Sequence, residues 1–560
     1  HRDLHSFPTR RSSDLFLNKI KTFTGILREQ LLILHPQIPD ECKEASFRAL
    51  AFVKVAGILL ECEGNWPSEI EERIKGVVDK EMALIYNGRH HKEFAIQESP
   101  IFGYSIDYNK FKIRWDETNE ENLRAYYQAM EWYSRCVFRS SSVSETQTAL
   151  LVLLASIADA GDGIGIWDEI NQMLTALYGE ADDLHLQDYQ KAARDFYGDS
   201  ISPSLLTDKK KVLQFCRQVE RMKLPRIRSE VGLKGGLRIF GGRYYDRDMI
   251  LQQMCYPYVG ENYDPRVVPS VLDIAVIMNQ TKAIELAEEK DFFRFSNYRA
   301  KVESYKNILQ QEINRTSTPW TVGGLVGDTW TYKPLMQPEW RGYPYFCRSD
   351  AWESRKLTSI LCGLIHLSDS RPVFTGKSND SFNGVVDPYP EFFNRMLTII
   401  RNLERLLYLV GYPLNRQPGQ EILLYKRTLE GVVQSATKIV AGENLQAEDH
   451  EKLGRLALGW ESEYQEANIN ELSTLFHRNA TQVDFYFHAG IEPIREMWVA
   501  FPSGPESSVM TRGGVYMLYE FFSTKKVFPE EWRKSELWKN VRDTRGLEEV
   551  APWLKSYDKH

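Results

Sequence analysis

The sequence lacks the residue patterns that mark most familiar enzyme classes. It has no GxSxG nucleophile turn, no HExxH helix, no Walker phosphate loop and no HxE…PCxxC deaminase signature, and the reactions tied to those patterns are therefore excluded. Its seven cysteines form no CxxC pair and no Cys/His spacing that suits zinc. An odd number of cysteines also gives no disulfide framework. We therefore predict no metal site, and the sequence leaves any cofactor and any reaction unknown.

Concentrated basic charge and long apolar runs are also absent. Lys and Arg number 70 against 77 Asp and Glu, for a formal net charge of −7. The one basic cluster, residues 209–211, is short, so nucleic acid is excluded as the main partner. The longest apolar run, residues 149–158, is too short to cross a bilayer and predicts a buried helix. We predict no transmembrane segment in a chain whose composition is typical of globular domains.

Residues 1–15 do not read as a native protein segment. One choice of codons for HRDLHSFPTRRSSDL spells a common short-read sequencing adapter. We interpret this segment as translated adapter DNA from a metagenomic contig and leave it out of the fold reasoning. The expectation is that the native N-terminus is missing, that residues 1–15 pack on nothing, and that order begins near Phe16.

Helical periodicity dominates residues 16–475. Within residues 118–137, Thr118 and Glu121 have the spacing of a capping box. Apolar residues then recur every three or four positions: Leu123, Tyr126, Tyr127, Met130 and Tyr133. Three further segments show the same spacing: residues 43–60, 391–410 and 421–440. The pattern predicts a large helical body.

The period changes in residues 476–560. Val483, Phe485 and Phe487 alternate with Asp484, Tyr486 and His488, which is the period of a strand. Two aromatic and β-branched runs, residues 497–501 and 515–522, flank the turn-forming residues 502–505 and predict a β-hairpin. A final helical stretch follows Pro529. The predicted fold class is mainly α, with a small C-terminal α+β portion of short antiparallel strands packed on the helical body as one unit.

A long segment rich in aromatic residues, residues 319–350, lies inside the helical body. We predict a loop here, because glycine and proline interrupt the helical pattern. Its aromatic residues are Trp320, Trp330, Trp340, Tyr343 and Tyr345. Either they line a cleft that binds sugars, or they anchor an ordered loop on the helices, and we favour the anchor.

The carboxylates Asp182 and Asp183 follow Glu180 in a segment that precedes a predicted helix. Clustered carboxylate oxygens suit a hard cation such as calcium. They also suit the N-terminus of the following helix, where anionic side chains meet free N–H groups. We favour capping, because the full set of oxygen ligands for a cation is missing.

Several short strings occur together in a familiar order. They are residues 98–103 (ESPIFG) with Asp107-Tyr108, 126–135 (YYQAMEWYSR), 238–243 (RIFGGR), 269–273 (PSVLD), Asp350-Ala351-Trp352 with Lys356-Leu357, 386–388 (VDP) with Glu391-Phe392, 518–521 (LYEF) and 530–533 (EEWR). Over nearly all of residues 16–557 the chain resembles the prokaryotic family named domain of unknown function 3160 (DUF3160). The family name states that its function is unknown. The resemblance implies an extracytoplasmic protein, either periplasmic, secreted or lipid-anchored.

The chain departs from the family pattern at two histidines. Residues 113–116 (IRWD) stand where the family typically carries a PRGHY-like string, and residues 367–371 (LSDSR), with Lys377-Ser378 further on, replace an LRHDT string. If those histidines bind metal or transfer protons in the family, this chain has lost or rebuilt that site. Structural roles for both histidines are equally allowed.

Two functions remain open from the sequence. We favour a binding or scaffold protein of the cell envelope, with an unknown ligand or envelope partner, since the replaced histidines argue against catalysis. The alternative is an extracytoplasmic hydrolase of a glycan or polymer that uses paired carboxylates such as Asp182, Asp183, Asp369 or Glu520. The candidate ligand-binding residues combine carboxylates, cations and aromatic rings: Asp182, Asp183, Arg243, Trp330, Trp352, Asp369, Arg371, Lys377 and Glu520.

These candidate residues predict one shared site. We expect Asp182, Asp183, Arg243 and residues 369–377 to approach one another or the segment 330–352. The competing expectation is that Asp182 caps a helix, Arg243 pairs with a carboxylate and Arg371 fixes a loop.

Overall fold

The fold comes from a computed structural model of the 560-residue chain. It describes residues 10–90, 96–112, 121–158, 161–198, 201–222, 235–243, 246–315, 325–336, 342–366, 386–409, 413–415, 419–451, 453, 471–480, 483–502, 508–524 and 527. The chain divides into two compact units, His1–Tyr244 and Tyr245–His560. This division falls inside the range that the sequence predicted as one helical body.

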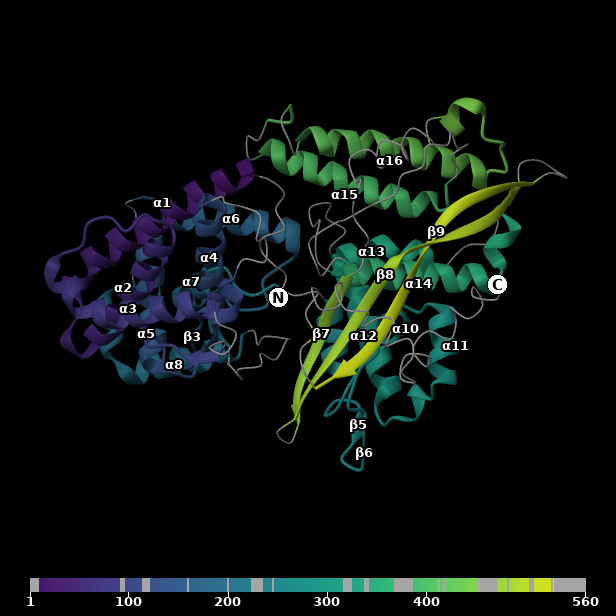
Figure 1. Ribbon diagram of the computed structural model, residues 1–560. Helices are drawn as coiled ribbons and strands as arrows, with labels where there is room; N and C mark the ends of the chain where they lie inside the picture. Colours follow the sequence, from purple (N-terminus) through teal and green to yellow (C-terminus); the bar gives the residue numbers. More distant parts are fainter. Residues whose placement is uncertain are drawn as a thin grey trace. The chain divides into compact units, whose positions relative to one another are not determined.

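The first unit is built from helices, drawn in purple to blue in Figure 1. They are α1 (Arg10–Leu34), α2 (Lys43–Leu59), α3 (Ser68–His90), α4 (Glu121–Arg135), α5 (Val143–Ile157), α6 (Gly163–Tyr178), α7 (Leu186–Tyr197) and α8 (Lys209–Glu220). Two short antiparallel pairs accompany them: β1 (Ile96–Glu98) with β2 (Ser105–Asp107), and β3 (Phe138–Arg139) with β4 (Gly236–Leu237). The predicted helices at residues 43–60 and 118–137 are confirmed as α2 and α4, although Thr118 of the predicted capping box lies outside the described residues.

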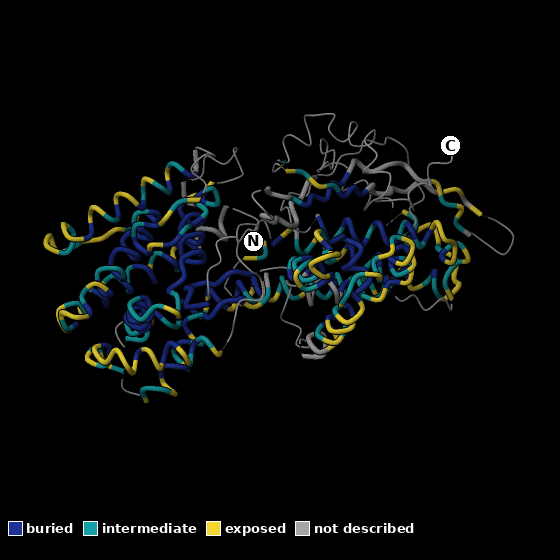
Figure 2. The backbone as a smooth tube through the Cα atoms, turned by 90° about the horizontal axis from the view of Figure 1, so that it is seen from below, coloured by how far each residue is buried: buried dark blue, intermediate teal, exposed yellow. Residues whose placement is uncertain are grey.

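The core of the first unit forms where α1, α2, α4 and α5 pack together. Both α2 and α5 are buried on nearly all sides, as their long apolar runs require. Phe52 of α2 lies edge-on to Phe138, with ring centroids 5.1 Å apart, and is tilted against Trp132 at 5.5 Å. Trp132 Nε1 donates to the Phe52 carbonyl oxygen at 3.0 Å. Figure 2 shows this interior in dark blue beneath exposed outer turns in yellow.

The second unit combines helices with one long antiparallel sheet. Its helices are α9 (Asp246–Gln253), α10 (Leu272–Ile277), α11 (Thr281–Glu289), α12 (Tyr298–Arg315), α13 (Leu325–Met336), α14 (Asp350–His366), α15 (Pro390–Leu409) and α16 (Gly419–Val440). A short pair, β5 (Gly260–Glu261) with β6 (Asp264–Pro265), precedes α10. The helices predicted at residues 391–410 and 421–440 are confirmed as α15 and α16.

The sheet has strand order β7 (Glu471–Ala480), β8 (Val483–Pro502) and β9 (Ser508–Ser523). The predicted hairpin is confirmed, because β8 and β9 are antiparallel and Pro502 pairs with Ser508. The register shifts between Glu492 and Arg495, next to Pro493, which has no N–H group for the ladder. Both α14 and α9 pack against the sheet, whose yellow strands cross the helices in Figure 1.

Five expectations about element boundaries and packing are corrected or stay open. Residues 319–350 are not a continuous loop, because α13 forms within them; the helix tolerates Pro334 because Thr331, Leu335 and Met336 are buried against neighbouring helices. Strand structure begins at Glu471, five residues before the predicted change. Helix α1 begins at Arg10, inside the segment interpreted as adapter. Residues 1–9, the side chains of residues 10–15 and the helix predicted after Pro529 lie outside the described residues, so whether residues 1–15 pack on anything stays open.

The mainly α fold class is confirmed. Among the described helices, none has both the length and the apolar composition that crossing a bilayer requires.

Candidate functional site

The acidic pair Asp182 and Asp183 lies in the first unit and fixes a buried turn. Asp183 accepts a hydrogen bond from Gly242 N at 2.9 Å, and its Oδ1 lies 3.2 Å from Arg238 Nε. The Asp182 N–H donates to the Gly242 carbonyl oxygen at 2.8 Å. Gly241 has φ +48°, and a Cβ there would lie 2.7 Å from the Ala181 side chain. The two segments therefore pack backbone to backbone.

The expectation that Asp182 or Asp183 caps the following helix is wrong. The capping box of α7 is formed by His185 and Asp188. Helix α7 begins at Leu186, so the two predicted carboxylates lie beyond the N-cap position and too far from the first free N–H groups. Within the described part of the chain, no three His, Cys, Asp or Glu side chains form a group that could hold a metal ion.

Arg243 joins the same part of the first unit. Its Nε donates to the Gly179 carbonyl at 3.0 Å, its Nη1 to the Phe240 carbonyl at 2.6 Å and its Nη2 to Asn171 Oδ1 at 2.7 Å. The side chain is fully buried. These three acceptors are neutral, and together they tie α6 to the segment after β4.

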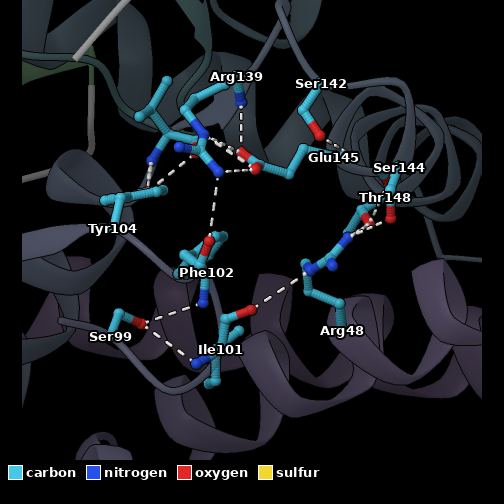
Figure 3. Close-up of polar contacts among 11 residues, drawn as sticks. Arg48, Ser99, Ile101, Phe102, Tyr104, Arg139, Ser142, Ser144, Glu145 and Thr148 are labelled. Atoms are coloured by element: carbon cyan, nitrogen blue, oxygen red, sulfur yellow. Dashed lines mark hydrogen bonds and ion pairs between the residues drawn. The ribbon is translucent and has the colours of Figure 1, made fainter.

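The ESPIFG string also fixes backbone in the first unit (Figure 3). The Ser99 hydroxyl accepts from Ile101 N at 3.3 Å and from Phe102 N at 3.2 Å. Arg139 donates through Nε to Glu145 Oε1 at 2.9 Å and reaches the Phe102 carbonyl, and Figure 3 shows this guanidinium facing the carboxylate. Because the contact from Arg139 joins the string to β3 and α5, the arrangement is a structural network.

In the second unit, a polar cluster surrounds the start of α10. Asp273 is fully buried and accepts from Arg266 Nη1 at 2.7 Å and Arg266 Nη2 at 3.0 Å, a two-point contact. Ser270 N and Tyr298 OH also donate to it, at 2.9 and 2.8 Å. The Arg266 guanidinium stacks on the Tyr298 and Phe292 rings. An ion pair, hydrogen bonds and stacking together stabilise this buried charge.

Glu520 of β9 lies beside this cluster. The Ser270 hydroxyl donates to its carboxylate at 3.1 Å, and Val271 N donates to Oε1. Burial raises the pKa of Glu520 to about 7, and the charge of Asp273 adds to the rise, whereas Lys290 and the two hydrogen bonds oppose it.

An aromatic cluster in the second unit has polar groups at its edge. We call it the Trp352 cluster: Phe346, Trp352, Arg355, Asp387 and Tyr389. Phe346 packs edge-on to Trp352, with centroids 4.7 Å apart. Trp352 Nε1 donates to Tyr389 OH at 2.7 Å. Trp352 and Tyr389 are thereby locked together, although 36 residues separate them in sequence.

The charged edge of the Trp352 cluster is a paired guanidinium and carboxylate. The Arg355 Cζ lies 4.4 Å from the Trp352 ring centroid, and Arg355 Nη1 donates to Asp387 Oδ2 at 2.9 Å. Asp387 remains more than one-third exposed. A planar guanidinium held on an aromatic face has a fixed orientation, and its carboxylate partner reaches solvent.

Two titratable groups at the cluster are buried, and burial shifts the pKa of each. The Lys356 ammonium is buried and donates to Glu353 Oε1 at 2.7 Å; burial lowers its pKa, and Glu353 opposes this. Burial also raises the pKa of the Cys347 thiol to about 12, so the sulfur stays protonated at neutral pH and does not act as a nucleophile.

Tyr345 is the exposed member of this neighbourhood. It lies on the short 3-10 helix η7 (Tyr345–Arg348), and 82% of its surface is accessible. The next two residues are fixed, since Phe346 packs on Trp352 and Cys347 is fully buried. The Tyr345 ring is therefore open to solvent, while the backbone that carries it is held in place by Phe346 and Cys347.

The comparison with family models decides the identity. A model described as protein of unknown function (DUF3160) matches residues 12–543. The chain belongs to the DUF3160 family. The resemblance stated from the short strings is thus confirmed. Neither the search of curated proteins nor the search of solved structures found a significant match.

The DUF3160 strings can now be placed in the fold. The ESPIFG and RIFGGR strings form buried turns in the first unit, whereas PSVLD and LYEF meet at the contact between Ser270 and Glu520. The strings around Trp352 and Asp387 meet in the Trp352 cluster. Several of these strings therefore contribute residues that hold distant segments together.

The predicted site residues divide between the units. Asp182, Asp183 and Arg243 come together in the first unit, and Trp352 and Glu520 lie buried in the second. Trp330 lies on α13, but its side chain is outside the described part of the structure. Asp369, Arg371 and Lys377 lie outside the described residues altogether. The shared site predicted for these DUF3160 residues stays a prediction.

Sequence reasoning missed Arg355, Arg266 and Asp273 as members of clusters. Asp273 and Asp387 do lie inside family strings, which was an available signal. Arg266 and Arg355 carried no signal, because an arginine stacked on an aromatic ring has no characteristic spacing in sequence.

Proposed function

We propose that this DUF3160 chain is an extracytoplasmic binding protein of the cell envelope, and that Tyr345 with the Trp352 cluster binds a glycan. The observation that carries the proposal is the exposed Tyr345 ring, whose neighbour in sequence, Phe346, packs on Trp352 of the cluster that holds the Arg355–Asp387 ion pair. The extracytoplasmic location is proposed from the family resemblance.

The chemistry of a glycan suits this combination. A pyranose ring has an apolar C–H face that stacks on an aromatic side chain, and its rim carries hydroxyl groups that need donors and acceptors. Tyr345 supplies the open aromatic face, and Asp387 supplies acceptor oxygens that reach solvent. Aromatic residues with few ordered polar groups are the usual composition of ligand sites, and rigid aromatic rings bind at low entropic cost.

The alternative function is an extracytoplasmic hydrolase of a glycan or polymer. Of the carboxylates that the sequence offered for it, Asp183 is engaged by Arg238 and Gly242, and Glu520 by Ser270 and Val271. At the Trp352 cluster, Asp387 is paired with Arg355 and Glu353 with Lys356. These pairings favour binding over hydrolysis, because glycoside cleavage needs two carboxyl groups that face the substrate.

Replacing Tyr345 with alanine is expected to weaken glycan binding by about 10- to 100-fold, the cost of losing a central aromatic contact. The matched control is Tyr263→Ala: Tyr263 is 85% exposed, near the β5–β6 turn of the same unit. The whole chain and both variants are applied to an array of immobilised bacterial polysaccharides. If a polysaccharide that binds the wild type binds Tyr345→Ala equally well, the proposed site is wrong.

A further inference from the structure

The contact between β9 and α10 depends on one buried carboxyl group, that of Glu520. We call Glu520, Ser270 and Val271 the β9–α10 contact. The Glu520 side chain is 5% exposed, and within the described residues no Lys, Arg or His lies within ion-pair distance of it. The carboxylate of neighbouring Asp273, in contrast, accepts two hydrogen bonds from the Arg266 guanidinium.

The donors at Glu520 suit a neutral acid better than a carboxylate. Among the residues that the structure describes, two donors reach it, the Val271 N–H and the Ser270 hydroxyl, whereas an ionised carboxylate has about four acceptor positions. In the protonated form, one oxygen still accepts from Val271 N, and the carboxyl O–H can donate to the Ser270 oxygen. A buried charge that is only half satisfied is costly, so burial favours the protonated form.

We propose that protonation of Glu520 stabilises the β9–α10 contact and that its ionisation loosens β9 from α10. The packing of the sheet on α10 then depends on pH. The proposal does not rest on the binding function above. It concerns the sheet whose strand β8 places Phe501 against Phe346, with ring centroids 5.9 Å apart.

The charged groups around Glu520 set the direction of the effect. Asp273 on α10 disfavours the ionised form, and Lys290, which follows α11, favours it. On α14, which packs against β9, Lys356 and Glu353 are paired with each other. On β8, His488 hydrogen-bonds to Ser523. With a pKa raised from 4.5 to about 7 in the folded chain, the stabilisation is complete below pH 4.5 and is lost as the pH rises through 7.

The test is amide hydrogen exchange of the intact chain, read at peptides that cover residues 515–523 and 271–277, from pH 5 to pH 8.5. After correction for intrinsic exchange rates, the opening equilibrium of the wild type is expected to rise on the order of 100-fold, with a midpoint near 7, because each pKa unit corresponds to a factor of ten. Glu520→Gln keeps the acceptor and removes the charge, so its opening equilibrium stays flat, and at pH 8 these peptides are better protected than in the wild type. The control Glu303→Gln, at an exposed position on α12, follows the wild type.

A second variant keeps the test decisive if Glu520→Gln does not fold. Ser270→Ala removes one donor to the ionised carboxylate and is expected to move the midpoint to higher pH, which a purely structural role for Ser270 would not do. A wild type whose opening equilibrium is flat between pH 5 and 8.5 overturns the proposal. So does a Glu520→Gln variant with the wild-type pH dependence.

Discussion

Replacing Arg266 with leucine is expected to lower the free energy of unfolding of the second unit by about 3–5 kcal/mol, because it leaves the Asp273 carboxylate buried and without its cation. The loss follows from the fourfold engagement of Asp273, which is fully buried. Leucine also gives up the stacking of the guanidinium on Tyr298 and Phe292. Urea unfolding followed by hydrogen exchange in α10 and α12 measures the change.

The double variant Arg266→Leu with Asp273→Leu is the control for this prediction. Removing both charges ends the desolvation penalty of the orphaned carboxylate, so the double variant is expected to be more stable than Arg266→Leu alone. If Arg266→Leu lowers the free energy of unfolding by less than about 1 kcal/mol, the Arg266–Asp273 ion pair does not stabilise the second unit in the way described here.

The second large effect is expected from Trp132→Ala in the first unit, which should cost about 3–5 kcal/mol. Trp132 is fully buried, packs against Phe52 and Phe102, and donates to the Phe52 carbonyl. Alanine leaves a cavity and removes the hydrogen bond from Trp132 Nε1 to the Phe52 carbonyl. Chemical unfolding monitored by hydrogen exchange in α2 and α4 gives the value.

Trp132→Phe separates the two contributions. Phenylalanine fills most of the cavity but cannot donate, so its cost should be clearly smaller than that of alanine. Equal costs for the two variants would mean that the hydrogen bond, not packing, holds this position.

Local pattern was enough to predict most helices and the hairpin. Helix α15 shows apolar residues at three- and four-residue spacing, and the sequence between β8 and β9 is rich in Pro and Gly, so each signal lies within one segment. Helix α13 was missed because it contains Pro334 and flanking glycines, and burial of Leu335 and Met336 against other helices outweighs them. Burial of that kind is set by distant segments, which a single segment does not reveal.

Members of the candidate site could be predicted from the sequence only where a single residue stood out by its own type or by its family string. Trp352 was identified by its aromatic surroundings and its family string. Its partners Arg355 and Asp387 were not, because their contact joins positions 32 residues apart. Asp183 was interpreted as a helix cap because proximity in sequence suggested it, whereas its partners Arg238 and Gly242 come from a segment more than 50 residues away.

The central claim is that this DUF3160 chain binds a glycan without cleaving it. The most direct measurement incubates the intact chain with each polysaccharide that it retains on the array and records bound protein and newly formed reducing ends in the same sample. The account predicts saturable binding that Tyr345→Ala weakens, with reducing ends no higher than in a heat-denatured control. Reducing ends that accumulate with time, or a complete lack of binding to every polysaccharide tested, would contradict it.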